Sequence, residues 1–157
     1  MCIRDRSLFD SKYTGSDGIE RNTAFNNQYV LNVLAGKEFS WGKQKQHRFT
    51  LDTKLTTAGG RFFTPVDLEA SQINEIEVRD ESRAFSEQFD PYFRWDIKMG
   101  VKLNSVKRKF SQAFYFDIQN VTNQENVFNR AYNRATNEVN ETLQLGFFPN
   151  FIYKIEF

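Results

Sequence analysis

Few side chains in this sequence could do chemistry, and they do not form a recognisable catalytic set. His47 is the only histidine, so neither a histidine-based triad nor a multi-histidine metal site can be built. Asp90 and Asp96 could suggest acid–base work, but nothing beside them in the sequence would shift a pKa in a predictable way. There is also no nucleotide-binding loop and no nucleophile next to a base. We therefore predict that the protein is not an enzyme and has no catalytic residue.

An acidic cluster in the middle of the chain is the best candidate for a metal site. It consists of Glu75, Glu77, Asp80 and Glu81. Carboxylate oxygens suit Ca²⁺, but this spacing is not that of a known calcium loop, which favours a solvated loop. The single cysteine, Cys2, cannot form an internal disulfide and gives no metal-site spacing. We predict neither a metal nor a cofactor.

The overall charge argues against a nucleic-acid partner. The chain of 157 residues has 21 Lys and Arg against 20 Asp and Glu, a formal net charge of +1. The basic stretch Lys107-Arg108-Lys109 is short, and we expect it to face water. Asn120-Val121-Thr122 and Asn140-Glu141-Thr142 match the glycosylation sequon, a match that we interpret as accidental.

The elements that must position these residues are strands, because apolar and polar residues alternate along most of the chain. In residues 92–103, Phe93, Trp95 and Ile97 begin an apolar face, and charged residues fill most positions between them. Residues 7–13 read as the end of an earlier strand. The other predicted strands are residues 28–39, 47–58, 110–121 and about 143–157. The fold class is therefore all-β.

The connections between these strands alternate in length, which favours a transmembrane β-barrel. Residues 40–46 and 104–109 are short turns, whereas residues 14–27, 59–91 and 122–142 are long. We expect residues 59–91 to be functional or mobile, and residues 122–142 to hold a short hairpin. Barrels of the outer membrane have long loops outside and short periplasmic turns. The predicted girdle of aromatic residues at the periplasmic rim is Phe39, Trp41, Phe110 and Phe157. No run approaches the ~18 apolar residues of a membrane-spanning helix.

The start of the chain is excluded from this fold reasoning. Residues 1–6 read M-C-I-R-D-R, which lacks the apolar core of a signal peptide. This stretch is similar to read-through of a sequencing adapter, so we expect a non-native leader. Residues 7–157 would then be one domain, the C-terminal part of a longer protein.

Several segments together resemble the C-terminal barrel of TonB-dependent outer-membrane receptors, in particular those of the Bacteroidetes group. The likeness covers about residues 8–157. The segments are G-K-E-F at residues 36–39, G-G-R-F-F-T-P-V-D at 59–67, F-D-I-Q-N-V-T-N at 116–123, N-V-F at 126–128, and the ending G-F-F-P to I-E-F at 146–157.

This resemblance implies that the chain supplies about six C-terminal strands of a 22-stranded antiparallel transmembrane barrel in the bacterial outer membrane. The protein would bind and import a scarce nutrient such as a siderophore, cobalamin, a glycan or a peptide. Its partners would be outer-membrane lipid, the plug and barrel strands missing from this sequence, the barrel-assembly machinery, and the inner-membrane TonB complex through the missing part. The alternative that stays open is a soluble β-sandwich or a lipocalin-like ligand-binding module.

The barrel interpretation assigns side chains to its two surfaces. The candidates to face the lumen or the plug are Arg94, Asp96, Lys98, Lys102, Asp117, Gln119, Lys154 and Glu156. The predicted C-terminal signal for barrel assembly is Tyr153, Ile155 and Phe157.

Overall fold

The computed structural model describes residues 2–105 and 110–156. Its main element is one antiparallel sheet of six strands, and each strand pairs with the next large-sheet strand along the chain. These strands are β1 (Cys2–Leu8), β4 (Tyr29–Trp41), β5 (His47–Ala58), β8 (Tyr92–Asn104), β9 (Ser111–Gln119) and β12 (Phe148–Glu156). The all-β prediction is confirmed. The described residues form an open sheet, and its membership of a 22-stranded barrel stays a prediction.

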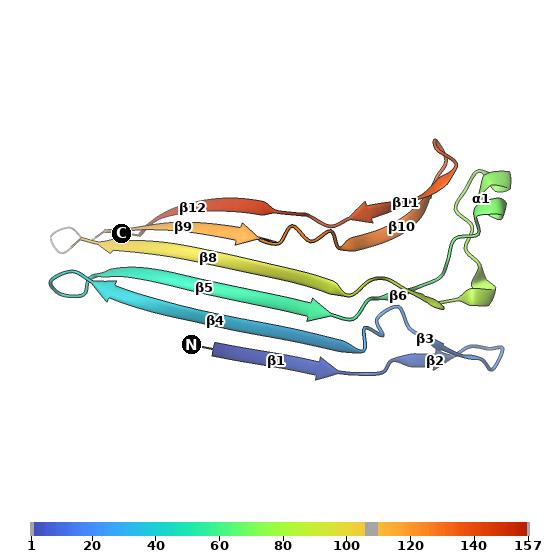
Figure 1. Cartoon of the computed structure of the whole chain (residues 1–157), viewed down its shortest axis with the longest axis horizontal. Helices are drawn as coiled ribbons and strands as arrows, with labels where there is room; N and C mark the ends of the chain where they lie inside the picture. Colours follow the sequence, from blue (N-terminus) through green and yellow to red (C-terminus); the bar gives the residue numbers. More distant parts are fainter. Residues whose placement is uncertain (1, 106–109, 157) are drawn as a thin grey trace.

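All long connections lie at one end of this sheet, the loop end, and carry the smaller elements (Figure 1). Strands β2 (Lys12–Thr14) and β3 (Glu20–Asn22) form one hairpin. Residues 59–91 contain β6 (Phe62–Phe63), helix α1 (Leu68–Asn74), the 3₁₀ turn η1 (Glu81–Arg83) and β7 (Glu87–Gln88). The hairpin expected in residues 122–142 exists as β10 (Val127–Asn133) and β11 (Glu138–Leu143).

The turn between β4 and β5, the end of β8, the start of β9 and the end of β12 lie at the opposite end of the sheet, the turn end (Figure 1). The predicted alternation of long and short connections therefore has the expected geometry. Which end faces the cell surface is untested by this geometry and stays a prediction.

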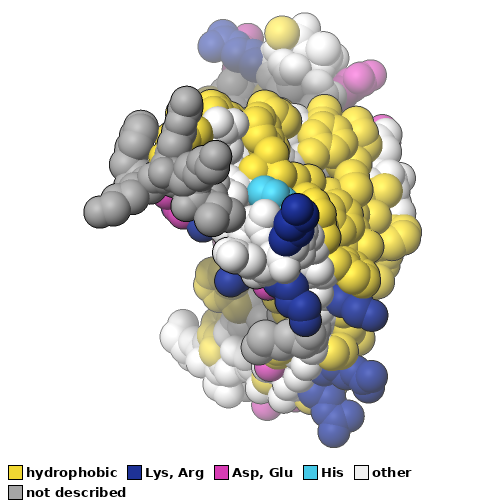
Figure 2. Space-filling model, turned by 90° about the vertical axis from the view of Figure 1, so that its left-hand side faces the viewer, with side chains coloured by type: hydrophobic (Ala, Val, Ile, Leu, Met, Phe, Trp, Pro, Cys, Tyr) yellow, Lys and Arg dark blue, Asp and Glu magenta, His cyan; other side chains and the backbone are white. Residues whose placement is uncertain are grey.

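The register of the strands gives the sheet one apolar face. The odd-numbered residues of β4, β5 and β8 lie level with the even-numbered residues of β9 and the odd-numbered residues of β12. One cross-strand row on this face reads Phe39, Phe49, Val101, Phe114 and Tyr153; the next reads Lys37, Leu51, Met99, Phe116 and Phe151. In Figure 2 the molecule curves, and hydrophobic side chains cover its convex side.

Many of these apolar side chains are exposed, and the sheet has no second layer to cover them. Phe151 is 64% exposed and Phe39 is 45% exposed. Among the described residues, the buried apolar side chains are only Ala58, Phe89 and Ala113. A packed core normally buries large aliphatic and aromatic residues, and the described residues do not form such a core over this face.

Trp95 and Thr53 are hydrogen-bonded on the apolar face. The indole N–H of Trp95 donates to Thr53 Oγ1 at 2.7 Å, and the Thr53 hydroxyl donates to the Asp96 carbonyl at 3.2 Å. Pairing these groups lets Trp95 and Thr53 stay on an apolar surface without an unmet hydrogen bond.

No helix in the described part of the chain is long and apolar enough to cross a membrane.

Two strand boundaries were predicted wrongly. The final strand begins at Phe148, not near residue 143, because Leu143 pairs with Val127 in the β10–β11 hairpin. Residues 7–13 are not one strand end, since β1 stops at Leu8 and β2 begins at Lys12.

Residues 2–6, excluded from the sequence reasoning, lie in β1 and pair with β4. The register places Arg4 opposite Val33 and Arg6 opposite Leu31, on the apolar face. These charges interrupt the apolar pattern of the other five strands. The prediction that residues 1–6 are a non-native leader remains untested, and this mismatch of charge is compatible with it.

Candidate functional site

The face opposite the apolar one carries all eight residues predicted to face a lumen or plug. They occupy the even-numbered positions of β8 and β12 and the odd-numbered positions of β9. They are Arg94, Asp96, Lys98, Lys102, Asp117, Gln119, Lys154 and Glu156. The structure thus brings them onto one surface, while the lumen itself stays a prediction.

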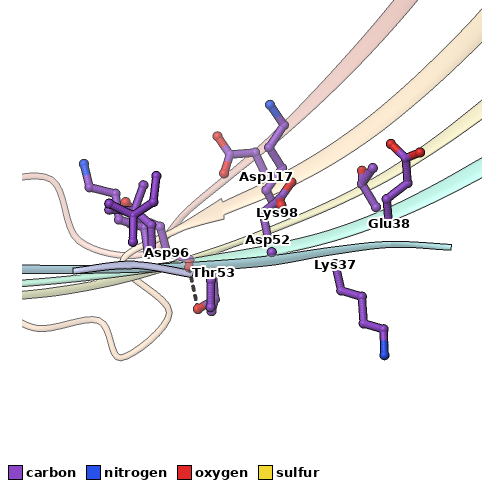
Figure 3. A pocket seen from close by; sticks show the side chains of 13 residues that line it. Lys37, Glu38, Asp52, Thr53, Asp96, Lys98 and Asp117 are labelled. Carbon is purple, nitrogen blue, oxygen red and sulfur yellow. Dashed lines mark hydrogen bonds between the residues drawn. The ribbon is translucent and has the colours of Figure 1, made fainter. Parts of the chain in front are cut away.

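Charges of opposite sign alternate across the strands of this polar face. Lys98 of β8 lies level with Asp52 of β5 on one side and with Asp117 of β9 on the other. Figure 3 shows these three side chains projecting from one side of the sheet, whereas Lys37 and Thr53 project from the other. Opposite charges at neighbouring cross-strand positions stabilise the pairing by about 0.2–1 kcal/mol each.

A hydrogen-bonded cluster lies on this face near the loop end. Arg94 Nε donates to Asp96 Oδ1 at 2.7 Å, and Arg94 Nη2 donates to Gln119 Oε1 at 2.9 Å. Asp96 Oδ1 also accepts the backbone N–H of Asn120 at 2.9 Å. The cluster fixes the orientation of the Arg94 guanidinium and ties the start of the β9–β12 connection to β8.

A second cluster lies near the turn end. Glu156 accepts hydrogen bonds from Lys102, from Lys154 at 2.8 Å and from the Ser111 hydroxyl at 3.3 Å. The last described residue of β12 is thereby joined to β8 and β9. Both clusters are made of paired charges, so they suit a structural or lining role and offer no free general base.

A hollow of about 530 Å³ lies on this sheet beside Asp52, Lys98 and Asp117. Gly36 forms part of its floor, because a Cβ on Gly36 would lie 2.1 Å from Asp52 Oδ1. Gly100 of β8 is also closely covered, because an added Cβ would lie 2.6 Å from Tyr115 Cδ1. The two glycines let the side chains of neighbouring strands lie flat over the backbone.

At the loop end, two arginines and two phenylalanines from separate connections form a stack. The Phe63 and Phe89 rings stack with centroids 4.2 Å apart. Arg61 lies 5.9 Å from the Phe89 centroid, and Arg130 of β10 lies 5.4 Å from the Phe63 centroid. Arg61 also donates to the Phe128 carbonyl. Cation–π contacts of this kind contribute about 0.5–1 kcal/mol at exposed sites.

Residues 59–91 are also tied to the β10–β11 hairpin by polar contacts. Arg134 pairs with Glu75, and Gln72 Nε2 donates to the Asn137 carbonyl at 2.8 Å. The Tyr132 N–H donates to Glu77 Oε2 at 3.2 Å. These contacts hold residues 59–91 against the β10–β11 hairpin.

The acidic cluster considered as a metal site is used in these contacts. Glu75 and Glu77 pair with Arg134 and Arg79, and Asp80 caps η1 by accepting the Ser82 N–H at 3.1 Å. That hydrogen-bonding, led by the Ser82 hydroxyl, holds the pKa of Asp80 below its usual value. No group of three or more possible metal ligands is found among the described residues.

Two buried asparagines hold the roots of the long connections. Asn126 donates through Nδ2 to the Phe93 carbonyl at 2.8 Å and accepts the Phe93 N–H through Oδ1 at 3.0 Å. Asn120, in the left-handed conformation with φ 51°, donates to the carbonyls of Gln124 and Leu145. In the Asn120-Val121-Thr122 sequon, the Asn120 side chain is therefore buried and fully engaged.

The remaining predicted residues lie as follows. His47 stands beside Trp41, with ring centroids 5.5 Å apart, at the turn end. Phe39, Trp41 and Phe110 also lie there, and the girdle at a periplasmic rim stays a prediction. Tyr153 and Ile155 of the predicted assembly signal lie on the apolar face and are exposed. Phe157 and residues 106–109 of the basic turn lie outside the described residues.

Sequence reasoning missed the Arg61–Phe89–Phe63–Arg130 stack and the Asn126 bridge. Neither leaves a local signal, because the partners come from connections far apart in the chain. Helix α1 did leave a local signal in the sequence, which is the capping residue Asp67 just before it. The Asp67 side chain accepts a hydrogen bond from the Ala70 N–H at 2.9 Å.

The chain matches no protein-family model, no curated protein and no solved structure.

Proposed function

We propose that this chain forms the C-terminal wall of a transmembrane β-barrel, as part of a TonB-dependent outer-membrane receptor that binds and imports a scarce nutrient. The observation that carries the proposal is the single-layer sheet with one exposed apolar face and one face of paired charges. A membrane barrel needs such a wall, because lipid covers the apolar face and the polar face meets the lumen.

Two further observations support the proposal. Strands β4, β5 and β8 have 12 or 13 residues, which exceeds the roughly 9–11 residues that a tilted strand needs to cross a bilayer. The long connections gather at one end, as loops of an outer-membrane barrel do. The receptor family itself is proposed from the sequence resemblance described above.

In this proposal the two ends of the sheet have different roles. The connections at the loop end contribute to capturing the nutrient, and the eight polar-face residues line the lumen or contact the plug. The two open edges of the sheet would be closed by the remaining strands of the barrel, since unpaired strand edges are not tolerated in lipid.

Cysteine labelling on intact cells tests the topology. Glu77→Cys at the loop end and Ser105→Cys at the turn end would each be introduced into the complete receptor with Cys2 replaced by Ser. A membrane-impermeant thiol reagent is expected to label Glu77→Cys on intact cells, and Ser105→Cys only after the outer membrane is permeabilised. Labelling of Ser105→Cys but not Glu77→Cys on intact cells would invert the topology, and labelling of neither after permeabilisation would reject it.

A further inference from the structure

The two ends of the sheet treat their cations differently. In the loop-end connections, every Lys and Arg except Arg61 has a carboxylate partner. These ion pairs are made by Lys12, Arg21, Arg79, Arg83, Arg130 and Arg134. Arg61 instead bonds to a carbonyl and stacks on aromatic rings. The cationic charge of the loop end is thus balanced within the protein.

The turn end keeps exposed lysines without such partners. Lys43 and Lys45 lie in the turn between β4 and β5, and Lys37 lies on the apolar face of β4. All three are exposed, and within the described part of the chain none of them forms an ion pair. Glu38, the nearest acidic residue in sequence, pairs with Arg48 at 3.5 Å.

Lys37 lies on the apolar face with its charge toward the turn end. Its stem starts in the apolar row of Leu51 and Met99, and its ammonium lies 5.0 Å from the centroid of the Phe39 ring, one row nearer the turn end. A lysine that lays its stem on an apolar surface and brings its charge toward the rim is snorkelling. Phe39 and Trp41 mark that rim with exposed aromatic rings, as interfacial belts do.

We propose that the turn end of this sheet binds the headgroups of anionic phospholipids through Lys37, Lys43 and Lys45. The inference rests on the proposed function, because it requires lipid against the apolar face. An anionic headgroup supplies the negative charge that the protein does not provide, at the depth where the aromatic rim ends. Each basic residue near an anionic bilayer surface adds about 1 kcal/mol, roughly a five-fold increase in affinity.

Fluorescence quenching in vesicles tests this locally, because the chain has one tryptophan near each end of the apolar face. Trp41 lies at the turn-end rim, and Trp95 lies nearer the loop end. Two forms of the complete receptor would be made, one keeping only Trp41 and one keeping only Trp95, with the other tryptophans replaced by Phe. Each would be reconstituted in phosphatidylcholine vesicles with brominated phosphatidylglycerol or brominated phosphatidylcholine as quencher.

We expect phosphatidylglycerol to bind beside Trp41 at least about five-fold more strongly than phosphatidylcholine, and beside Trp95 with a ratio near one. Lys43→Gln together with Lys45→Gln should reduce the Trp41 ratio toward one, and high salt should do the same in the unchanged protein. The matched control Lys12→Gln with Arg134→Gln removes two paired cations at the loop end and should leave the Trp41 ratio unchanged.

The inference is overturned if the Trp41 ratio is near one in the unchanged protein, or if it survives both the lysine substitutions and high salt. A different failure would point to the proposed function itself. If no brominated lipid quenches either tryptophan, the apolar face does not contact lipid, and the barrel proposal falls with the lipid site.

Discussion

The sheet and the loop end of this molecule differ in what they bury. The buried polar side chains of the described residues all lie in the long connections, at Asn26, Thr64, Ser71, Asn120 and Asn126. The sheet instead exposes large apolar side chains such as Phe151 and Tyr153. The connections are thus held by hydrogen bonds within the chain, whereas the sheet is held by its backbone ladder and by whatever covers its apolar face.

The two regions should therefore respond to mutation through separate mechanisms. A change on the sheet acts through the surrounding medium, because the side chain contacts that medium. A change at the loop end acts through the loss or obstruction of a specific internal contact. Variants of the complete receptor in lipid vesicles can separate the two mechanisms.

The largest effect is expected at Met99, midway along β8 on the apolar face. Met99→Arg would place a charge against hydrocarbon and should destabilise the protein by about 2–4 kcal/mol. Met99→Ala should cost much less than the ~2–5 kcal/mol typical of a packed core, because lipid chains fill the space. Equilibrium unfolding from vesicles measures both.

Lys98→Gln is the control, since Lys98 lies on the opposite, polar face next to Met99 and its loss should be mild. A large penalty for Met99→Ala combined with a small one for Met99→Arg would assign Met99 to a protein core, and the comparison between sheet and loop end would break down.

The next effect is expected at the root of residues 59–91. A Cβ on Gly60 would lie 1.7 Å from the Phe89 carbonyl oxygen, a backbone atom that cannot move aside. Gly60→Ala should therefore cost about 3 kcal/mol and make this connection more sensitive to protease. Gly18→Ala is a milder control: nothing lies within 4 Å of its Cβ, and only its φ of +74° opposes the change. Equal sensitivity of the two variants would contradict the close contact.

A smaller effect is expected for Asn126→Ala. The substitution leaves both the N–H and the C=O of Phe93 without their partner. Water can enter the neighbouring polar hollow, so the cost should be about 1–2 kcal/mol. Faster hydrogen exchange at the Phe93 amide is the direct readout. The control Asn140→Ala, at an exposed position of β11, should change neither the stability nor the exchange rate of the Phe93 amide. An unchanged exchange rate of that amide in Asn126→Ala would show that Asn126 does not hold the Phe93 backbone.

The smallest effect concerns acid sensitivity of the β2–β3 hairpin. A hydrogen bond from Arg21, helped by the Ile19 N–H, lowers the pKa of Asp17 to about 2. Because the folded pKa is below the unfolded one, this contribution is fully present above about pH 4 and is lost as the pH falls toward 2. Chemical shifts of the hairpin should titrate with a midpoint near 2 in the wild type, and Arg21→Gln should raise it. A wild-type midpoint near 4 would show that the contact does not form.

The sheet could be largely predicted from the sequence because alternation reports directly on strands. The range 47–58 predicted for β5 agrees with the structure, and the start of β8 at Tyr92 does as well. The eight polar-face residues could be assigned to one side for the same reason, since a period of two leaves no freedom once the register is set. The β1 strand was missed because residues 1–6 were left out of the fold reasoning as an expected non-native leader.

The loop end could be predicted only as long, polar connections, one of them with a hairpin. Its contacts join residues far apart in sequence, such as Gln72 with Asn137 and Arg61 with Phe128. Such contacts depend on where the sheet brings the roots of the connections, and no periodic pattern encodes them. The asparagines of residues 120–126 were noticed as part of a motif. Their hydrogen bonds to backbone groups could be identified only from the structure.

The order of the strands has a consequence for how the chain assembles. Every strand of the sheet pairs with its sequence neighbour in that sheet, but the intervening segments differ greatly: residues 59–91 between β5 and β8 are six to seven times longer than residues 42–46 between β4 and β5. Closing the longer segment costs about 1.7 kcal/mol more in chain entropy. The β4–β5 and β8–β9 hairpins should therefore form first and then pair with each other. The short turns would set the rate of hairpin formation, and the long connections would affect only the later docking of one hairpin onto the next.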